Sequence, residues 1–444
     1  MKRQRFFATL GAGLALATVA ACSGSSTAAP SVPPSPTAKV TGTVEFWHFF
    51  TGREEAAIKT AVADFHTKYP DITVNVHGGQ DDEKMLKAIA AGQPIDLALS
   101  STTDRAGKFC QSGAFKDLKG YIDRDKLDLT QFPDAVLAYT QFNGVRCTLP
   151  MLSDVYGLYY NKAMLSAAGV TEPPKTLGEL TDLAKKLTVL NPDGSIKVAG
   201  FVPLMGWYEN APAHFAPSYG SKWLNADATS AIGGDPTWQE MAKWQKDLVD
   251  YYGVDKLTKF TSGLGQEFSA DNAFEKGKVA MVIDGEYRSA FVTAEAPTLP
   301  YATAPFPTGD NHTDLYGGGY ITGNIMGIGK GSTNPEAAWL LMKYLTTDTD
   351  AMVKLANSIK NVPTTKAALA SPKLEADANY TTFLKIFADP HSSTTPASPT
   401  GSQYQDTMAD FFTKWQTGKV SDLQAALNDV DKQINDALAL ATGP

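Results

Sequence analysis

Residues 43–76 read TVEFWHFFTGREEAAIKTAVADFHTKYPDITVNV, and this stretch decides the fold class. It opens with strand-forming residues, and apolar residues then recur at the spacing of one helix face until Tyr69-Pro70 ends the pattern. Residues 72–76 alternate as a strand does, and after a second helical stretch residues 95–100 form a third strand-like run. This alternation predicts an α/β chain with a mostly parallel sheet and covering helices.

Helix starts are marked by capping signals. Thr51 with Glu54, and Thr176 with Glu179, have the spacing of a capping box, in which two backbone amides at a helix start find side-chain acceptors. Asn334, placed before a proline, is expected to cap a third helix. The strand and helix pattern restarts after residue 150, so a second unit of the same class is expected.

The N-terminus has the layout of a secretory signal. Three positive residues stand within the first five, and a short apolar run of small residues covers residues 6–21. The run ends in Val19–Cys22, which resembles a bacterial lipobox. We expect cleavage after residue 21 and lipid attachment to Cys22; the alternative is an ordinary signal peptide with a chance cysteine. No later apolar run is long enough to span a membrane.

Two polar segments lack the apolar residues needed for a core. Residues 22–42 are rich in Ser, Thr, Ala and Pro, and are predicted to be a disordered tether. Residues 392–403 are Ser-, Thr- and Pro-rich and are expected to be a surface loop. The remaining chain is long enough for two domains. Without residues 1–21 its formal net charge is −11, which argues against nucleic acid as a partner.

Cysteine usage is sparse. If Cys22 carries lipid, Cys110 and Cys147 remain. Outside the cytoplasm two such cysteines usually pair, so a disulfide is favoured over two buried free thiols.

Seven short motifs follow one another in an order known from one family. They are Val44–His48, Ile95–Ala98, Leu158–Lys162, Pro173–Thr176, Phe274–Met281, Tyr316–Tyr320 and Asn361–Thr364. The set resembles the cluster-B-type extracellular solute-binding proteins, relatives of the maltose- and glycerophosphodiester-binding proteins. Two departures stand out: Leu177 replaces a usual Trp, and Gly285–Tyr287 replaces a "G-x-W" aromatic platform. The second departure favours a smaller or more polar ligand.

The resemblance implies a two-lobed periplasmic-binding-protein fold (type II, Venus-flytrap) with hinge crossovers. We expect crossings near residues 152–154, 300–307 and 362–364. Lobe 1 would then comprise residues 43–152 and 308–362, and lobe 2 residues 153–307 and 363–444. The implied function is a substrate-binding lipoprotein of an ABC importer, which captures a carbohydrate between its lobes and delivers it to permease subunits. We expect a monomer, no catalysis, no metal and no cofactor.

Candidate ligand residues follow from the chemistry of sugars, which present apolar C–H faces and many hydroxyls. Aromatic rings suit the faces, and carboxylates, amides and backbone groups suit the hydroxyls. Open α/β sheets place such groups at the carboxyl ends of strands. The candidates are Trp47, His48, Ser100, Ser101, Asp154, Tyr156, Trp207, Tyr208, Glu209, Gly285, Glu286, Arg288 and Gly318. By the resemblance, Asp154 matches an acid that bonds sugar hydroxyls in the maltose-binding branch.

Several of these residues have a structural alternative. Trp47 suits a core as well as a ligand platform. For His48 a hydrogen bond in the cleft is favoured over a metal, because no second histidine stands at useful spacing. The glycines around Gly318 are expected to allow close ligand approach, with a simple bend as the alternative. Glu286 and Arg288 suit a surface ion pair as well as the cleft.

Two competing functions remain open. A secreted glycoside hydrolase would need two carboxylates across the cleft, and Asp154, Glu209 and Glu286 are available. A glycerophosphodiester-binding protein would need a positive clamp, for which Arg288 and Arg53 are the candidates. The sequence has neither a phosphate-loop nor a dinucleotide-binding glycine motif.

Overall fold

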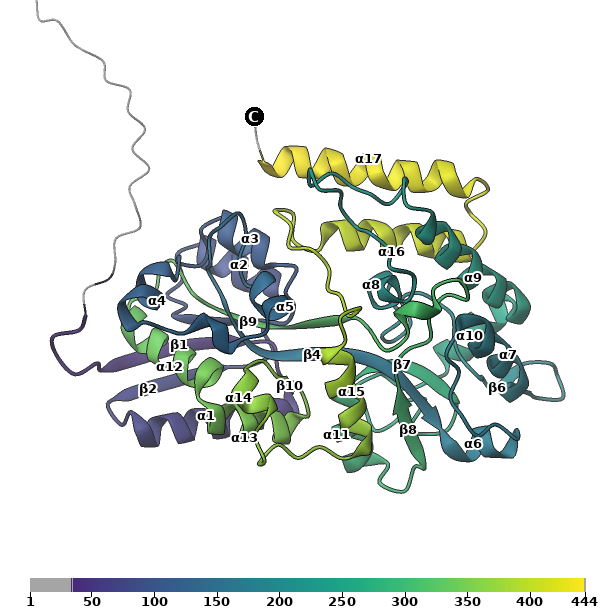
Figure 1. Cartoon of the computed structure of the whole chain (residues 1–444), viewed down its shortest axis with the longest axis horizontal. Coiled ribbons are helices and arrows are strands. Elements are labelled where there is room, and N and C mark those ends of the chain that lie inside the picture. The colour runs from purple at the N-terminus through teal and green to yellow at the C-terminus, as the bar shows by residue number, and fades with distance from the viewer. Residues whose placement is uncertain (1–32, 34, 443–444) are drawn as a thin grey trace, which may run out of the picture. The chain divides into compact units, whose positions relative to one another are not determined.

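The computed structural model describes residues 33 and 35–442. The predicted signal peptide, Cys22 and most of the predicted tether lie outside the described residues. Within them, an eight-stranded sheet has the order β10-β4-β9-β3-β1-β2, and β7 and β8 also pair with β4 (Figure 1). The strands of this sheet are β1 (Gly42–His48), β2 (Ile72–His77), β3 (Leu97–Ser100), β4 (Leu149–Asn161), β7 (Met281–Gly285), β8 (Tyr301–Ala304), β9 (Ile321–Ile328) and β10 (Val362–Pro363). Among the helices of these residues, none is both long and apolar enough to cross a membrane.

Lobe 1 is built around β1, β2 and β3, which run parallel, as the sequence predicts. The other pairings of the eight-stranded sheet are antiparallel, so the sheet is mixed and the expectation of a mostly parallel sheet holds only for these three strands. Strand β9 closes this part of the sheet antiparallel to β3. Its apolar core draws on residues 44–152 and 326–368. The helices of lobe 1 are α1 (Gly52–Lys68), α2 (Asp82–Ala90), α3 (Ala106–Gln111), α4 (Lys119–Asp125), η1 (Leu129–Gln131), α5 (Asp134–Ala138), α12 (Pro335–Thr347), α13 (Thr349–Ile359) and α14 (Lys366–Leu369).

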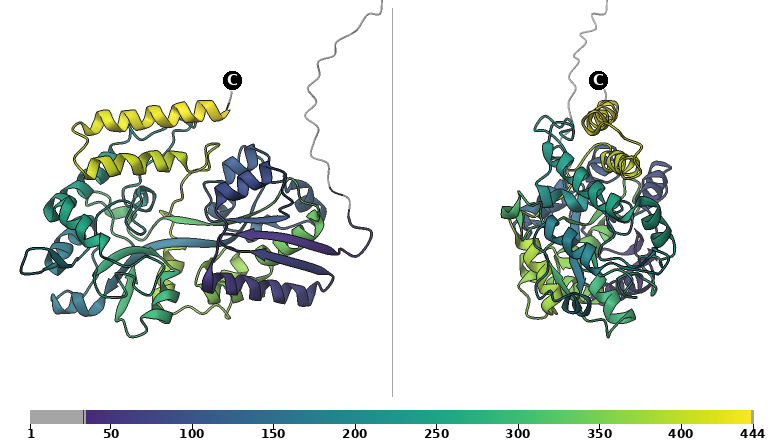
Figure 2. Two further views of the ribbon diagram at one scale, coloured as in Figure 1. Left: turned by 180° about the vertical axis from the view of Figure 1, so that it is seen from behind. Right: turned by 90° about the vertical axis from the view of Figure 1, so that its right-hand side faces the viewer.

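Lobe 2 is built around the second half of β4, which pairs antiparallel with β7 and β8. Its core draws on residues 155–321, 362 and 380–434. The other elements of lobe 2 are α6 (Lys162–Ala167), α7 (Leu177–Leu187), β5 (Val189–Leu190), β6 (Ile196–Val198), α8 (Pro212–Phe215), η2 (Ala216–Tyr219), α9 (Pro236–Tyr252), α10 (Val254–Ser262), α11 (Arg288–Glu295), η3 (Thr313–Leu315), α15 (Ala378–Ala388), α16 (Gln403–Gln416) and α17 (Leu423–Thr442). Figure 2 shows α16 and α17 side by side, and the two helices pack against each other.

Three strands connect the lobes: β4, β9 and β10. The crossing expected at residues 300–307 is wrong, because residues 301–304 form β8 and pair within lobe 2. Thr308 then donates its backbone N–H to Lys175 O, and Ile321 still packs in the core of lobe 2. The second crossing is therefore β9, which begins at Ile321.

The capping signals were only partly confirmed. Thr176 and Glu179 form the predicted capping box at the start of α7. Thr51 precedes α1, but its side chain makes no capping hydrogen bond. Asn334 makes none either; its amide donates instead to Thr43 O across lobe 1. The Glu54 carboxyl group therefore takes no part in a capping box at the start of α1.

The segment 392–403 is a loop, as expected, but part of it is buried. Thr395 and Ser398 are each only 1% exposed, because the segment packs against lobe 1. Thr394 Oγ1 lies 3.4 Å from Thr103 Oγ1, and a Cβ on Gly107 would meet Ser398 O at 2.2 Å. The segment was expected on the surface because it is polar. Its burial was missed because its hydroxyl groups find hydrogen-bond partners inside the protein.

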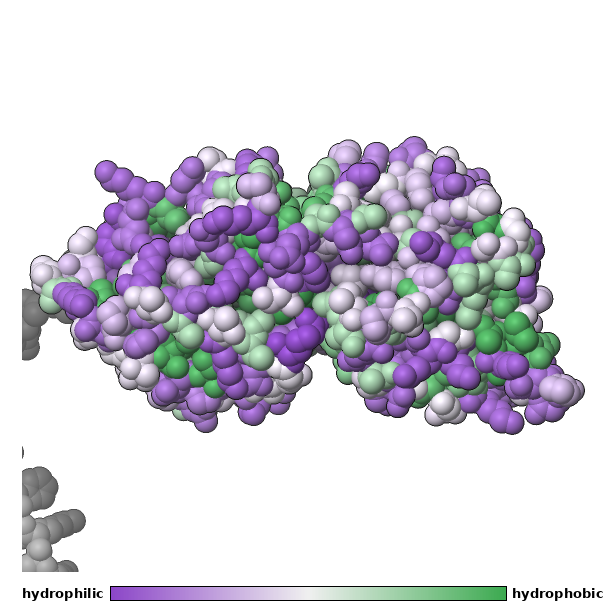
Figure 3. Space-filling model, turned by 90° about the horizontal axis from the view of Figure 1, so that it is seen from below, coloured by the Kyte–Doolittle hydropathy of each residue, from purple (hydrophilic) through white to green (hydrophobic). Residues whose placement is uncertain are grey.

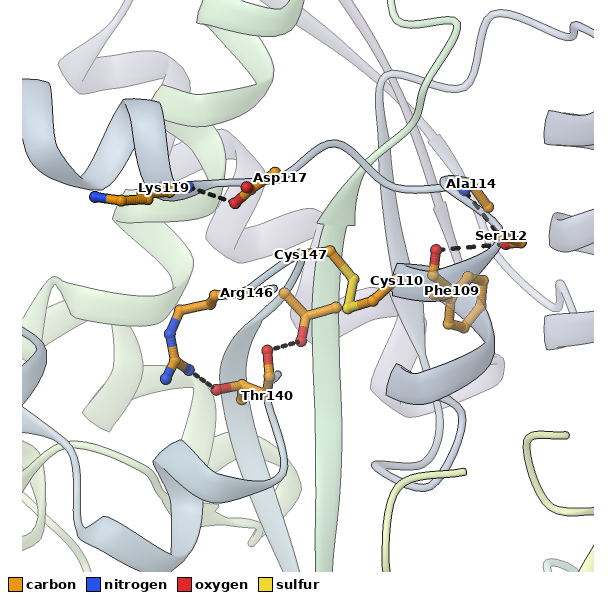
Figure 4. The surroundings of a disulfide bond; sticks show 10 residues. Phe109, Cys110, Ser112, Ala114, Asp117, Lys119, Thr140, Arg146 and Cys147 are labelled. Atoms are coloured by element: carbon orange, nitrogen blue, oxygen red, sulfur yellow. Dashed lines mark hydrogen bonds between the residues drawn. A yellow bond between two sulfur atoms is a disulfide. The ribbon is translucent and has the colours of Figure 1, made fainter. Parts of the chain in front are cut away.

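The predicted disulfide is present. Cys110 of α3 bonds to Cys147, which stands two residues before β4, and the two Cα atoms are 5.4 Å apart (Figure 4). Arg146 points away from the sulfurs and donates to Leu137 O and Thr140 Oγ1. The bond therefore fixes α3 to the start of the first crossing strand.

Candidate functional site

A groove of about 460 Å³ is lined by both lobes. Lobe 1 contributes the turn between β1 and α1, and lobe 2 contributes α11 and the loop after α10. The lining residues are Phe49, Phe50, Thr51, Gly52, Arg53, Glu54, Phe268, Phe291, Ala294 and Glu295. This volume falls within the usual range of small-molecule sites. Figure 3 shows the surface hollowed between the lobes on the face seen from below.

The lobe 1 wall of the groove is the start of α1. Because Thr51 and Glu54 do not form a capping box, the Glu54 side chain turns toward lobe 2 and is only 21% exposed. Burial raises the pKa of Glu54, and the positive charges of Arg53 and Arg288 oppose that rise. Arg53 lies 4.8 Å from the centre of the Phe291 ring, so the two lobes touch at this point.

An aromatic series leads from the groove into lobe 2. The rings are, in order, Phe291, Phe268, Tyr287, Tyr156, His214 and Tyr320, and successive centroids are 5.8, 6.1, 6.4, 3.9 and 4.9 Å apart. Phe268 is 58% exposed, whereas Tyr287, Tyr156 and Tyr320, deeper in lobe 2, are only 9%, 7% and 5% exposed. Phe49 and Phe50, with centroids 4.1 Å apart, face the groove from lobe 1. The groove thus offers rings on both walls.

Arg288 is fully buried behind the lobe 2 wall. Its guanidinium nitrogens lie 2.7 Å from Asp284, 3.5 Å from Glu275 and 3.8 Å from Glu267. Its carbon Cζ also stands 5.4 Å from the ring centre of Phe268. Arg288 therefore holds the aromatic wall from behind, and its charge is already matched by carboxylates.

Glu209 lies at the deep side of this wall. Its Oε1 accepts a hydrogen bond of 2.6 Å from Tyr287 Oη. Carboxylate oxygens of Glu209, Glu267 and Asp284 lie within 4.8 Å of one another, a spacing that suits a cation, and here Arg288 supplies the positive charge. Burial, followed by the charge of Glu209, raises the pKa of Glu267 to about 10.

Among the candidates from the sequence, Asp154, Tyr156 and Glu209 do meet in this region. Tyr156 belongs to the aromatic series, and the charges of Glu54 and Glu209 both act on Asp154. A Cβ on Gly285 would meet the Tyr287 ring at 2.2 Å, so this glycine makes room for the ring. Their roles toward a ligand remain predictions.

Glu286 and Arg288 do not form the surface ion pair considered from sequence. Both are fully buried, and each has other partners. Glu286 accepts hydrogen bonds from Val155 N at 2.6 Å and from Asn361 Nδ2 at 3.0 Å.

Four candidates at strand ends in lobe 1 lie elsewhere. His48 is fully buried, with Phe46 and Phe50 rings at 5.3 and 6.2 Å, and burial lowers its pKa to about 4. Trp47 points to the opposite face of the sheet, where its ring lies 5.8 Å from Lys84 Nζ. The expectation that ligand-binding groups lie at the carboxyl ends of strands identifies an edge of the sheet. It does not show which face of the sheet at that edge lines the groove.

Ser100 and Ser101 serve the structure of lobe 1. Their hydroxyls donate to Asp82 Oδ2 at 3.0 and 3.3 Å. Asp82 is 5% exposed, and burial raises its pKa to about 6.

Gly318 meets the chain itself rather than a ligand. A Cβ there would lie 2.7 Å from the carbonyl carbon of His391. Trp207 and Tyr208 stack on each other at 4.1 Å, and Tyr208 Oη donates to Gly265 O at 2.6 Å. These three residues have no place in the lining of the groove.

Sequence reasoning missed Phe49, Phe50, Phe268 and Phe291. Phe268 lies in a loop without periodicity, and Phe291 resembles an ordinary core residue of an amphipathic helix. The available signal was the pair Phe49-Phe50 directly before Thr51, with the acid Glu54 at capping distance from Thr51.

Comparison with known proteins gives a consistent result. The family of bacterial extracellular solute-binding proteins matches residues 51–352. A protein of Brucella abortus (strain 2308), whose name describes it as a binding protein, is 29% identical over 63% of this chain. The alignment covers 66% of that relative, so the chain spans just under two thirds of its length. The maltotriose-binding protein of Pyrococcus abyssi (strain GE5 / Orsay) is 23% identical over 76% of this chain and 69% of its own.

Solved structures agree. The structure of CpMnBP1 with mannotriose bound superposes with a TM-score of 0.80 at 25% identity, and covers 88% of this chain and 99% of its own. The two-lobed α/β fold implied by the sequence motifs is thereby confirmed.

Proposed function

From the premise that the chain belongs to the family of bacterial extracellular solute-binding proteins, we propose that it captures a neutral oligosaccharide between its lobes for an ABC importer. The family acts outside the cytoplasm, and so does this chain. The bound sugar would be delivered to permease subunits after the lobes close over it, a shift of an open–closed equilibrium that needs no chemistry.

The observation that carries this proposal is the aromatic groove. Phe49 and Phe50 on one lobe and Phe268 and Phe291 on the other give apolar faces for the C–H surfaces of sugar rings. Glu54 adds a carboxylate acceptor for hydroxyl groups from the lobe 1 side. The names of CpMnBP1 with mannotriose and of the maltotriose-binding protein support a ligand of this class.

The charge of the site argues for a neutral ligand over a glycerophosphodiester. Arg288 is enclosed by three carboxylates and has no exposed surface with which to bind a phosphate. Arg53 donates to Ser358 O at 3.0 Å and stacks on Phe291. With Glu54 beside it, the groove lacks the positive clamp that a phosphodiester requires.

The arrangement of the acids argues for binding over hydrolysis. Glu286 is fully buried and accepts from the backbone, so it cannot reach a glycosidic bond. Asp154 and Glu286 are tied to the same Asn361 amide, instead of facing each other across a substrate. A retaining or inverting hydrolase would place its two carboxyl groups on either side of the scissile bond.

The membrane attachment belongs to the same proposal. The small residues before Cys22 favour a lipid anchor at that cysteine, with residues 22–42 as the tether. Such an anchor would hold a monomer near its permease without a spanning helix.

A thermal-shift screen tests the proposed function. The purified protein is heated with mannotriose, maltotriose, monosaccharides and a glycerophosphodiester. A ligand that binds only the folded state stabilises it by about 2.7 kcal/mol at a hundredfold excess over its dissociation constant. A rise in Tm with a neutral oligosaccharide supports the proposal; a rise with the phosphodiester alone would replace it.

A further inference from the structure

A buried polar unit joins the three strands that cross between the lobes. Its members come from β4, from β9, from the residue before β10, and from the residue after β7. They are Asp154, Asn324, Asn361 and Glu286, and their exposures are 8%, 1%, 2% and 0%. Any change in the angle between the lobes must pass through these strands, so the unit lies at the hinge.

Two carboxyl groups of this unit depend on one amide. Asn361 Nδ2 donates both to Asp154 Oδ1 and to Glu286 Oε1, the latter at 3.0 Å. Glu286 Oε2 accepts from Val155 N at 2.6 Å, and Asp154 Oδ2 has a long contact of 3.4 Å with Asn324 Nδ2. Within residues 35–442, no Lys, Arg or His forms an ion pair with either carboxyl group. Two buried carboxylates without a cation cannot both be ionised at low cost.

The groups that face the pair are acidic or neutral. The carboxyl groups of Glu54 on α1 and Glu209 in lobe 2 act on Asp154, and tyrosines surround the rest. These tyrosines are Tyr139, Tyr156, Tyr159, Tyr320 and Tyr380. Burial, reinforced by the charges of Glu54 and Glu209, raises the pKa of Asp154 to about 8. Burial and the charge of Asp154 raise the pKa of Glu286 well above its ordinary value.

We propose that Glu286 is a positioning residue that acts through Asp154: the two carboxyl groups and the Asn361 amide hold a proton at the hinge, and ligand binding is coupled to its uptake. This inference rests on the proposed function, because the coupling requires a ligand that closes the lobes. Asp154, at 8% exposed, is the less enclosed member of the pair. The proton comes from solvent when the lobes close, and it returns to solvent when they open.

The direction of the pH effect follows from burial. Closing the lobes removes water from Asp154, so its pKa is higher in the closed state than in the open state. The closed state therefore binds more protons, and affinity is highest below the open-state pKa. Affinity falls as the pH rises toward 8, by up to about tenfold per pH unit for one proton. His48 and His214, whose pKa values burial lowers to about 4, stay neutral over this range.

Asp82→Asn is the matched control for Glu286→Gln. It makes the same change from carboxyl to amide at a side chain that is 5% exposed and whose pKa burial raises to about 6. Asp82 lies in α2 of lobe 1, outside the crossing strands and outside the lining of the groove. Asp284 and Glu275, whose pKa values burial raises to about 6 and about 7, stay intact in both variants.

The first measurement uses no ligand. Thermal unfolding of wild type and Glu286→Gln is compared at pH 5 and pH 8. Gln resembles the protonated acid, so the variant is expected to gain Tm relative to wild type as the pH rises. If the Tm difference between wild type and Glu286→Gln is the same at pH 5 and pH 8, the proposal that the hinge pair holds a proton is wrong.

The second measurement is calorimetric titration with mannotriose and maltotriose from pH 5 to pH 8. We expect wild type and Asp82→Asn to lose affinity as the pH rises, and Glu286→Gln to show a flat profile. Equal slopes in all three proteins overturn the role of Glu286. If neither trisaccharide binds at any pH, both the proposed function and the coupling of binding to proton uptake are wrong. The unfolding comparison then still shows whether the hinge pair holds a proton.

Discussion

Replacement of Arg288 by Met is the sharpest test of the site's electrostatics. Met keeps most of the apolar stem, so the change mainly removes the charge. In the native protein this charge lies 2.7, 3.5 and 3.8 Å from Asp284, Glu275 and Glu267, with no solvent exposure. Breaking a buried ion pair by removing one partner costs roughly 3–5 kcal/mol. For a lobe of this size the expected loss is roughly 6–20 °C in Tm.

The loss should depend on pH in a fixed direction. Burial raises the pKa of Asp284 to about 6 and that of Glu275 to about 7. Without Arg288 these values rise further, so protonation at pH 5 relieves the variant and ionisation at pH 8 does not. One further unit in one pKa makes the loss about 1.4 kcal/mol smaller at pH 5 than at pH 8.

Thermal unfolding at both pH values is the assay. Lys432→Met, which removes a surface ion pair with Asp436 at 2.7 Å, is the control and should change stability by less than about 1 kcal/mol. A loss for Arg288→Met as small as that of the control, or one that is equal at pH 5 and pH 8, would refute the reasoning.

Two further predictions concern stability. Changing Cys110 and Cys147 together to Ser should lower the free energy of unfolding by roughly 2–5 kcal/mol, because the bond closes a loop between positions 37 residues apart; unchanged denaturant midpoints under oxidising conditions would contradict this. Thr176→Ala should cost about 1 kcal/mol because it breaks the capping box with Glu179, whereas Thr51→Ala should cost clearly less because Thr51 makes no capping bond. Denaturant unfolding of both variants measures the difference, and equal losses would be inconsistent with the two caps as described.

The first half of the fold could be predicted because local patterns decide it. Residues 43–100 alternate between strand and helix patterns, which indicates parallel strands joined by helices. Strands β1, β2 and β3 are parallel, as expected. The crossing at β9 was misplaced because the pairing partners of β8 and β9 are set by the tertiary fold, and a local sequence pattern does not reveal them. The partial burial of the segment 392–403 was missed for a related reason: hydroxyl groups of the segment bond to distant residues, which a sequence pattern does not reveal.

The site was predictable only in part. Asp154 and Tyr156 lie on a crossing strand, and the charge of Glu209 acts on Asp154, so the three lie near one another, although none of them lines the groove. His48 was misassigned because the alternation in β1 turns positions 44, 46 and 48 toward the core of lobe 1. The phenylalanine walls come from a loop and from a short helix, Phe268 and α11, whose approach to lobe 1 is a property of the tertiary fold.

The central claim is that a neutral oligosaccharide binds in the phenylalanine-lined groove. The most direct measurement is calorimetric titration of the screened sugar into wild type, Phe268→Ala and Tyr251→Ala. Phe268 and Tyr251 are equally exposed aromatics of lobe 2, at 58% and 55%, but only Phe268 lines the groove. We predict a loss of roughly tenfold in affinity for Phe268→Ala and no change for Tyr251→Ala. Equal affinities in all three proteins would contradict the assignment of the groove.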